Sequence, residues 1–303
     1  VSGDRLAFIG RNGDLAQPAA LRAPTLDGKV GAGFDPCGAL RCALTLGPGE
    51  ARELVFLLGQ GTSREAARTL IERYRAPEAA VHAEAQSVAQ WRTIVRQTEV
   101  RTPDADLNTL LNGWLLYQTL VCRIYARSAF YQSGGAYGYR DQLQDVMALL
   151  HSAPELSRAQ IVRAAARQFI EGDVQHWWHP PSGRGIRTGF SDDYLWLPYV
   201  VAVYTEVTGD AAVLDEIVPF IEGHALAPGE AEYYDLPERS NEHGSVYEHC
   251  VRALDYGLGR IGQHGLPLMG GGDWNDGMNM VGHEGRGESV WVGWFLYTNL
   301  MQF

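Results

Sequence analysis

The chain has 303 residues, 46% of them hydrophobic and 20% charged, which is typical of a soluble globular protein with room for about two domains. Its 25 basic and 36 acidic residues give a formal net charge of −11, which argues against a nucleic-acid or anionic-membrane surface. No apolar run approaches the ~20 residues that a membrane span requires.

The cysteines point to a reducing compartment. Cys37, Cys42, Cys122 and Cys250 are scattered, and no two have the CxxC spacing of a zinc or redox site. Structural thiols therefore fit better than a disulfide framework, and we expect a cytoplasmic protein. The chain opens on Val1 without an initiator methionine and closes within an apolar helical pattern, so we expect it to be a piece of a larger polypeptide.

Residues 1–62 have the pattern of short β-strands. Turn-rich sequences (RNGD, DPCG and GPGE) separate three apolar stretches with partial alternation, RLAFIG (5–10), RCALTLG (41–47) and RELVFLLG (52–59). This spacing predicts the C-terminal part of a β-sandwich domain. A helical period begins at Ser63, a natural N-cap, and resumes after Pro77, which predicts a helical linker over 63–100.

From residue 101 onward we expect helices throughout. The pattern predicts a long, mostly buried helix over 107–130, and the shorter ones are expected over 140–151, 157–171, 191–209, 211–223, 245–262 and 288–300. Ser191 is a natural N-cap and Gly209 a natural residue just past a helix end. Long apolar helices joined by long loops predict an α-helical toroid, and acids near the starts of alternate helices would gather at one mouth of it.

The strongest candidate site is the stretch GLPLMGGGDWNDGMN (265–279). Glycines 270–272 allow close approach of backbone and ligand, and Trp274 and Asn275 lie between Asp273 and Asp276. An exposed indole can stack on a sugar ring while a carboxyl group protonates a glycosidic oxygen. The alternative is an Asn-Asp-Gly turn joining two helices, although a simple turn has no need of a tryptophan between two acids.

Of the two acids, Asp276 is the better candidate for the general acid, because Asn275-Asp276-Gly277 places it at the apex of a turn. A general acid needs a raised pKa, which a pocket beside Trp274 could supply by desolvating Asp276. Asp273 more naturally braces the loop or its tryptophan.

Two other polar segments are candidates for holding sugar hydroxyls. Arg187 and Asp193 flank the sequence GFSD, and both side chains suit hydroxyl binding, although helix capping is the alternative for Asp192 or Asp193. Asp193 begins its helix in register with Trp196. Arg140 and Asp141 open another helix, where a purely structural ion pair is equally consistent with the pattern.

The remaining motifs are weaker indications of function. Residues 176–179 (HWWH) suggest an aromatic platform at a pocket rim, and the histidines lack a recognised metal-ligand spacing. Glu248 and His249 lie on a helix that otherwise packs. The chain has no GxSxG elbow and no Walker loop, and its GGGD does not follow a strand as a dinucleotide fingerprint would.

Taken together, five motifs resemble family 94 of the glycoside hydrolases, the inverting β-glucoside phosphorylases: YGYRDQLQD, EGDVQHWW, GIRTGFSDDYLWL, HGLPLMGGGDWNDGMN and GESVW. The N-terminal sequences IGRNGDLAQPAAL, GAGFDPCGAL and VFLLGQG match the β-sandwich of the same family. Within it, the chain is most similar to the phosphorylase domain of cyclic β-1,2-glucan synthases.

The resemblance implies a β-sandwich over 1–62, a helical linker over 63–100 and the N-terminal half of an (α/α)6 barrel over 101–303. It also implies that Asp276 is the general acid and that Trp274, Arg187 and Asp193 hold the glucose at the donor subsite. With Arg140, Asp141 and Asn275, these complete the candidate substrate-binding set. No metal or cofactor is implied, because inorganic phosphate is the co-substrate.

The implied reaction is phosphorolysis of a β-linked glucan, with β-1,2-glucan expected, to α-glucose 1-phosphate. Phosphate is already an anionic nucleophile, so no second carboxylate is needed. The implied partners are the glucan, phosphate and the rest of an inner-membrane-anchored parent; a homo-oligomer stays open, and no nucleic acid is expected. We expect the chain alone to be inactive, because the phosphate site lies in the absent half of the barrel. The alternatives are an inverting hydrolase with a base such as Glu284, and a non-catalytic glycan-binding module.

Overall fold

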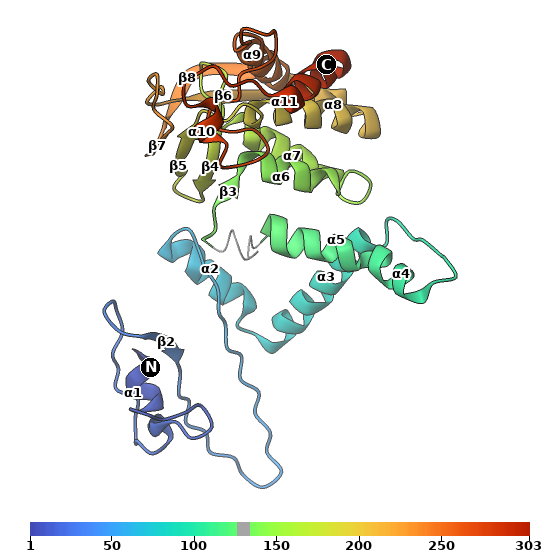
Figure 1. Ribbon diagram of the computed structural model, residues 1–303. Helices are drawn as coiled ribbons and strands as arrows, with labels where there is room; N and C mark the ends of the chain where they lie inside the picture. Colours follow the sequence, from blue (N-terminus) through green and yellow to red (C-terminus); the bar gives the residue numbers. More distant parts are fainter. Residues whose placement is uncertain (126–133) are drawn as a thin grey trace. The chain divides into compact units, whose positions relative to one another are not determined.

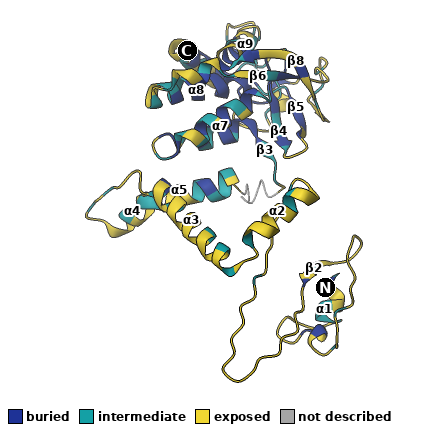
Figure 2. Ribbon diagram, turned by 180° about the vertical axis from the view of Figure 1, so that it is seen from behind, coloured by how far each residue is buried: buried dark blue, intermediate teal, exposed yellow. Residues whose placement is uncertain are grey.

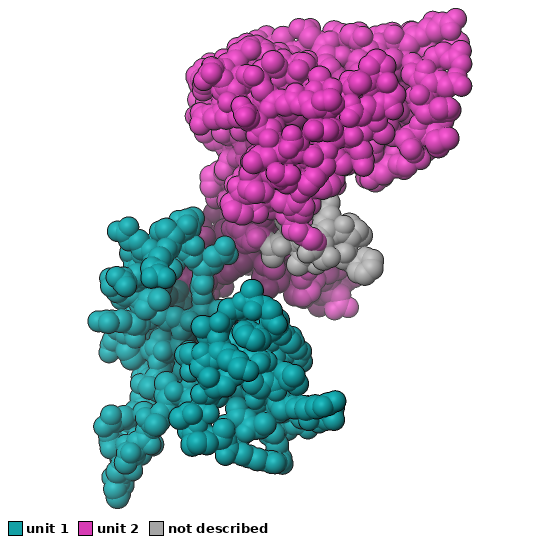
Figure 3. Space-filling view, turned by 90° about the vertical axis from the view of Figure 1, so that its left-hand side faces the viewer, with its two compact units in different colours: residues 1–84 teal, residues 85–303 magenta. Residues whose placement is uncertain are grey.

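The computed structural model of the protein describes residues 1–125 and 134–303. The chain forms two compact units, Val1–Glu84 and Ala85–Phe303, which are coloured separately in Figure 3. No helix among the described residues is both long enough and apolar enough to cross a membrane. The four cysteines are free thiols, and of these Cys250 is buried.

The first unit has little regular structure before Ser63. Strand β1 (Ser2–Asp4) pairs antiparallel with β2 (Pro36–Ala39), and between them in sequence lie helix α1 (Arg5–Ile9) and the 3-10 turn η1 (Ala19–Leu21). Helix α2 (Arg64–Tyr74) follows, and Ser63 caps it as predicted, by accepting a hydrogen bond from the N–H of Ala66.

The three strands predicted in this unit were wrong. RLAFIG forms α1, because the carboxylate of Asp4 accepts hydrogen bonds from the N–H groups of Leu6 and Ala7 and so starts a helix. Residues 41–60, all of them described, lie outside any strand. A strand needs a neighbour to satisfy its backbone N–H and C=O groups, and without one the apolar side chains of Leu54 and Phe56 stay exposed.

A helical run opens the second unit. Helix α3 (Pro77–Val95), which begins in the first unit, leads through a loop to α4 (Ala105–Thr109), the π-helical η2 (Leu110–Trp114), α5 (Leu115–Gln118) and the π-helical η3 (Thr119–Tyr125). The predicted long, buried helix over 107–130 is therefore broken, with a kink at Asn112 and at Gly113, where φ is 125°. Leu120 is the buried side chain of its described part, and residues 126–130 lie outside the described residues.

The rest of the unit mixes sheets with helices, so the expectation of helices throughout was wrong. The larger sheet is antiparallel and has the order β3-β4-β5-β7, and its strands are β3 (Tyr137–Gly138), β4 (Gln175–His179), β5 (Arg184–Thr188) and β7 (Glu232–Asp235). A second sheet pairs β6 (Ile217–Glu222) with β8 (Glu238–Ser245). The segment predicted as a helix over 211–223 divides into the 3-10 turn η6 (Ala211–Asp215) and β6, because β8 supplies the partner that its β-branched residues favour.

Helices form the core beside these sheets (Figure 1). They are α6 (Tyr139–Met147), α7 (Pro154–Ala165), the 3-10 turn η5 (Asp193–Leu195) continued by α8 (Trp196–Thr208), α9 (Val246–Leu258), the short α10 (Asn279–Gly282) and α11 (Val290–Gln302). Gly209 ends α8 at a φ of 73°, as predicted. Leu143, Leu197 and Val292 are among the fully buried residues of one hydrophobic cluster. Figure 2 shows buried residues concentrated in these elements, whereas α2 and most of α3 are exposed.

Candidate active site

The glycine-rich loop packs its backbone against the turn that precedes η5. The N–H of Gly271 donates a hydrogen bond to the carbonyl oxygen of Gly189 at 3.0 Å, and the N–H of Ser191 donates to that of Gly272 at 2.9 Å. A Cβ on Gly270, whose φ is +61°, would lie 2.0 Å from the Gly189 oxygen. The glycines therefore serve the close approach of two backbone segments, whereas the sequence had suggested an approach to ligand.

Asp273 braces this loop, as predicted. Its side chain is buried, and the carboxylate accepts hydrogen bonds from the N–H of Asn275 at 2.9 Å and from the hydroxyl of Ser289 at 2.8 Å. The Ser289 hydroxyl in turn accepts the N–H of Val292 and so caps α11. Asp273 thereby ties the loop to the start of that helix.

The guanidinium of Arg140, at the start of α6, joins three segments of the chain. Its Nη1 lies 3.0 Å from Asp192 Oδ1 and 2.7 Å from the carbonyl oxygen of Asp273. Its Nη2 donates to the carboxylate of Asp276, and its Nε lies 3.9 Å from Asp193 Oδ1. The Arg140 side chain is only 8% exposed, so its charge is stabilised by these carboxylates rather than by water. We call Arg140, Asp192, Asp193 and Asp276 the Arg140 cluster.

The two adjacent aspartates have different partners. Asp192 is fully buried and accepts hydrogen bonds from Arg140 and, at 3.0 Å, from the indole N–H of Trp196. Burial, reinforced by the charge of Asp193, raises the pKa of Asp192 to about 7 although Arg140 acts against the shift. Neither aspartate makes the side-chain cap considered from the sequence, and Trp196 turns toward Asp192 instead of Asp193.

Asp193 is also buried, and His176 of β4 is its main partner. His176 Nδ1 lies 2.7 Å from Asp193 Oδ2, whereas Asp193 Oδ1 has no hydrogen-bond partner among the described residues. Burial alone lowers the pKa of His176, but the Asp193 carboxylate outweighs it and holds the pKa of His176 above its ordinary value. The His176 ring also packs on Phe190, 4.6 Å between centroids.

Asp276 and Trp274 stand at the exposed side of the cluster. The Asp276 side chain is 67% exposed and Trp274 is 52% exposed, so the desolvating pocket expected around Asp276 is not formed here. The indole N–H of Trp274 donates to the side-chain oxygen of Gln144 at 3.3 Å, which attaches the loop to α6 a second time. An exposed carboxyl beside a buried cation and an exposed indole is an arrangement that a bound sugar could cover.

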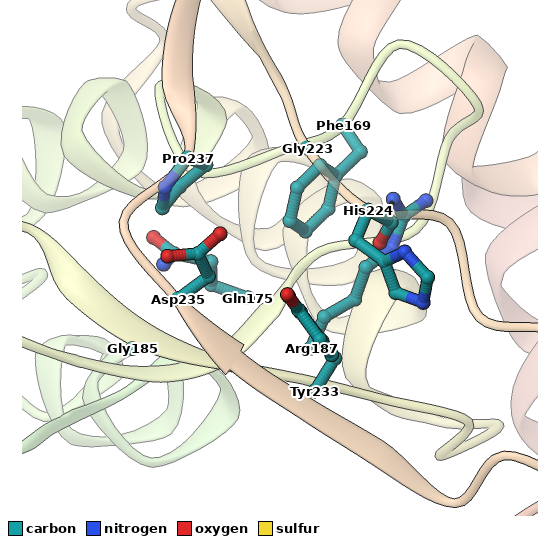
Figure 4. Close-up of a pocket in the computed structure, with 9 residues that line it drawn as sticks. All are labelled: Phe169, Gln175, Gly185, Arg187, Gly223, His224, Tyr233, Asp235 and Pro237. Atoms are coloured by element: carbon teal, nitrogen blue, oxygen red, sulfur yellow. Dashed lines mark hydrogen bonds between the residues drawn. The ribbon is translucent and has the colours of Figure 1, made fainter.

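Arg187 occupies a separate cleft. Its Nε and Nη2 lie 2.7 Å and 2.5 Å from the two carboxylate oxygens of Asp173, Nη2 also contacts Glu171 at 3.1 Å, and Nη1 donates to the carbonyl oxygen of His224 at 3.0 Å. The guanidinium stacks over the ring of Phe169, 3.8 Å from its centroid. Figure 4 shows this cleft, which Gln175, Tyr233 and Asp235 also line.

No direct contact joins Arg187 to Asp193 in the described part of the chain, although the sequence suggested that the two act together. Four of the five N–H groups of Arg187 already have acceptors. Burial raises the pKa of Asp173 against the lowering effect of Arg187. The pair is thus a buried ion pair within its own cleft.

Family models match almost the whole chain. The catalytic domain of the glycosyl hydrolase 94 superfamily matches residues 90–303, and the glycosyl hydrolase 94 supersandwich domain matches residues 1–77. The chain belongs to glycosyl hydrolase family 94. The resemblance seen in the sequence motifs is therefore confirmed.

Several curated relatives are similar over nearly all of this family 94 chain. The cyclic β-(1,2)-glucan synthase of Rhizobium meliloti is 48% identical over 99% of the chain, the solabiose phosphorylase of Paenibacillus borealis 31% over 97%, and the N,N'-diacetylchitobiose phosphorylase of Vibrio proteolyticus 30% over 99%. The chain spans 11%, 35% and 38% of the lengths of these three proteins, respectively.

Sequence reasoning singled out several of the residues that meet in this candidate site and missed others. Arg140, Asp193 and Asp276 meet in one cluster, with Asn275 and Trp274 on the same loop as Asp276, and Asp141 lies in the first turn of α6 beside Arg140. Asp173 and the His176–Asp193 contact were missed. The acid in EGDVQH was an available signal for Asp173, but it gives no indication of the His176–Asp193 contact. Within residues 1–125 and 134–303, no three His, Cys, Asp or Glu side chains form a group that could hold a metal ion.

Proposed function

We propose that this chain is part of an inverting glycoside phosphorylase that cleaves a β-linked glucan with inorganic phosphate and releases α-glucose 1-phosphate. One observation carries the proposal: the exposed Asp276 carboxyl, on a loop with an exposed tryptophan, contacts a buried arginine that two further aspartates share. The family assignment and the phosphorylases among the relatives support the reaction type.

In the proposed reaction Asp276 is the general acid. A phosphate oxygen attacks the anomeric carbon as the bond from that carbon to the glycosidic oxygen breaks, and Asp276 gives its proton to the departing oxygen. The configuration changes from β to α, and the reverse reaction extends the chain. If Asp276 carries a proton, Arg140 still has Asp193 as a counter-charge and Asp192 as a hydrogen-bond acceptor, so protonation does not leave a buried cation without a partner.

The other candidates bind the sugar in this proposal. The exposed Trp274 offers its ring as a stacking surface, and Asn275 offers an amide beside it. Asp193 Oδ1, which has no hydrogen-bond donor among the described residues, would accept a sugar hydroxyl. One N–H group of Arg187 has no acceptor in the described part of the chain and would donate to a hydroxyl. Arg140 and Asp141 complete the set at the start of α6.

We also propose the domain boundaries of the chain, the kind of parent protein and the linkage of the glucan. Residues 1–62 would belong to a β-sandwich, 63–100 to a helical linker, and 101–303 to the first half of an (α/α)6 barrel; a supersandwich model over 1–77 and a catalytic-domain model over 90–303 support the order of the two domains. The parent would be a protein like cyclic β-1,2-glucan synthase, cytoplasmic and attached to the inner membrane, and its substrate a β-1,2-glucan. The 48% identity to the Rhizobium meliloti enzyme supports this choice of linkage.

The chain alone is proposed to be inactive, so the decisive assay uses the parent polypeptide that carries it. The parent is incubated with short β-1,2-, β-1,3- and β-1,4-glucans, with and without phosphate. Phosphate-dependent release of glucose 1-phosphate, greatest with the β-1,2 linkage, is expected. Replacing Asp276→Asn should lower the rate by about 10²–10⁴-fold, as for removal of a general acid.

The same assay distinguishes the phosphorylase from the two alternatives, a hydrolase and a glycan-binding module. Phosphate-independent release of glucose would favour a hydrolase, although its candidate base Glu284 is exposed and pairs with Arg286 instead of with a member of the Arg140 cluster. A parent that binds glucan with and without Asp276→Asn but never turns it over would be a binding module, and the proposal would be wrong.

A further inference from the structure

The sheet β3-β4-β5-β7 has two unlike faces. Trp178 of β4 points into the core, where it is 1% exposed and lies against Tyr137 of β3, with 5.9 Å between ring centroids. Its neighbours in sequence, Trp177 and His179, point to the opposite face, because successive side chains of a strand alternate. Those two residues are only partly buried.

The strand register brings further side chains to that second face. Trp177 is paired with Ile186 of β5, and Ile186 is paired with Tyr234 of β7, so Trp177 and Tyr234 share a face across three strands. His179 is paired with Arg184 in the same way.

Ring contacts confirm this grouping. The Trp177 ring lies 5.2 Å from that of His179 and 5.7 Å from that of Tyr234, measured between centroids. The Arg184 guanidinium lies 5.8 Å from the centre of the Tyr234 ring. We call Trp177, His179, Arg184 and Tyr234 the aromatic face.

The aromatic face begins next to the Arg140 cluster. His176, which bonds Asp193, immediately precedes Trp177 on β4. The register shift between Gln175 and Trp177 leaves one extra residue on β4, which interrupts the alternation and places His176 on the same side of the sheet as Trp177. From β4 to β7 the face crosses two strand spacings, or about 10 Å, which is wider than one sugar ring. A chain bound at the cluster can therefore continue over it.

The chemistry of the face suits a glycan. Tyr234 is 48% exposed and Arg184 is exposed, so ring surface and hydrogen-bond donors alternate over a short distance. Rings pack against the C–H faces of sugars while a guanidinium and an imidazole bond their hydroxyls. Rings and a guanidinium also occur in protein interfaces, so the choice of a glycan rests on the continuity of this face with the Arg140 cluster.

We propose that the aromatic face is a subsite for the distal units of a β-linked glucan of at least three glucosyl residues, the remainder of which lies at the Arg140 cluster. The choice of a glucan as occupant rests on the proposed function. The position of the face fits a role in selecting chain length, since a disaccharide held at the cluster would end before reaching Tyr234.

The test is a calorimetric titration of the 303-residue chain with β-1,2-linked gluco-oligosaccharides of increasing length, beginning with the disaccharide. Wild-type affinity should rise with length. Trp177→Ala and Tyr234→Ala should each weaken binding of the longest oligosaccharide by about three- to tenfold and leave the disaccharide unchanged. Trp177→Phe should keep the wild-type length dependence, and so should Tyr247→Ala, a control tyrosine on α9 that is 51% exposed.

Circular dichroism shows whether each variant is folded. If Trp177→Ala does not fold, the inference is tested with Tyr234→Ala alone. The inference is overturned if wild-type affinity does not depend on length, or if both alanine variants keep the wild-type dependence. Its failure is separable from that of the proposed function. Phosphorolysis by the parent with normal length dependence in Trp177→Ala rejects only the subsite, whereas a parent without phosphorolysis that still shows the binding loss rejects only the reaction.

Discussion

Arg140 Nη1 lies 2.7 Å from the main-chain carbonyl oxygen of Asp273, a residue 133 positions further along the chain. The contact joins the start of α6 to the glycine-rich loop, and the same nitrogen holds Asp192 before η5. One buried side chain thus sets the positions of three segments that contribute to the candidate active site. Its second terminal nitrogen holds the Asp276 carboxylate on the same loop.

Replacing Arg140 should destabilise the second unit strongly. Arg140→Ala leaves Asp192 and Asp193 buried without their cation, which typically costs about 3–5 kcal/mol of the free energy of unfolding. Arg140→Lys should recover part of this, because a lysine restores the charge but cannot donate to several acceptors at once.

Urea denaturation measures both variants. Arg101→Ala is the matched control, since its pair with Glu99 is mostly exposed, and it should cost no more than about 1 kcal/mol. Equal effects of the Arg140 and Arg101 substitutions would show that the cluster does not hold the unit together.

The Arg140 cluster should make stability depend on pH. Folded Asp192 keeps its proton up to about pH 7, whereas the unfolded carboxyl releases it near its ordinary pKa of 3.8. Between these values the folded state binds more protons, so the free energy of unfolding should fall as pH rises from about 4 to about 7. The raised pKa of His176 acts in the same direction, because its contribution is complete below 6.5 and is lost as pH rises through the folded value.

Asp192→Asn should flatten this dependence even though it also lowers stability at every pH. Denaturation of the wild type and the variant at several pH values between 4 and 7.5 gives the two slopes. Asp255→Asn, an exposed carboxylate on α9, should keep the wild-type slope. An unchanged slope in Asp192→Asn would contradict the assignment of the proton to that residue.

Two substitutions distinguish the stability cost of a steric clash at the glycine-rich loop from the cost of a positive φ. Gly270 and Gly277 both have positive φ, at +61° and +79°, but a Cβ on Gly270 would lie 2.0 Å from a carbonyl oxygen whereas one on Gly277 meets nothing within 4 Å. Gly277→Ala should therefore cost only the conformational penalty of about 1–2 kcal/mol, and Gly270→Ala should cost clearly more. The melting temperatures of the two variants measure this difference. Similar melting temperatures would mean that the glycine-rich loop can move away from the turn before η5 without loss of stability.

The sequence predicted correctly those features that depend only on neighbouring residues. Ser63 and Gly209 were correctly predicted as helix boundaries because a cap involves only the adjacent turn. The brace formed by Asp273 could be expected for the same reason, since its first partner is the N–H of Asn275.

The sequence was insufficient where partners come from far along the chain. Strand β5 was not recognised because its partner β7 comes from a distant part of the chain. The sequence also contained no indication of the ion pair between Arg187 and Asp173, which lies 14 residues earlier on another segment. Pairing between distant segments is decided by packing and desolvation, which no local pattern of residue types records.

Ser289 gives a last prediction because it has two roles at once. Its hydroxyl donates to Asp273 Oδ2 and accepts the N–H of Val292, so Ser289→Ala removes the cap of α11 and also leaves a buried carboxylate oxygen without its donor. Ser245→Ala removes only a cap, that of α9, where the hydroxyl accepts the N–H of Glu248. We expect about 1 kcal/mol of destabilisation for Ser245→Ala and about 2–3 kcal/mol for Ser289→Ala. Because Asp273 holds the loop that carries Asp276, Ser289→Ala should also lower phosphorolysis by the parent, and an equal effect of the two substitutions on both stability and activity would show that the Asp273–Ser289 bond does not position the loop.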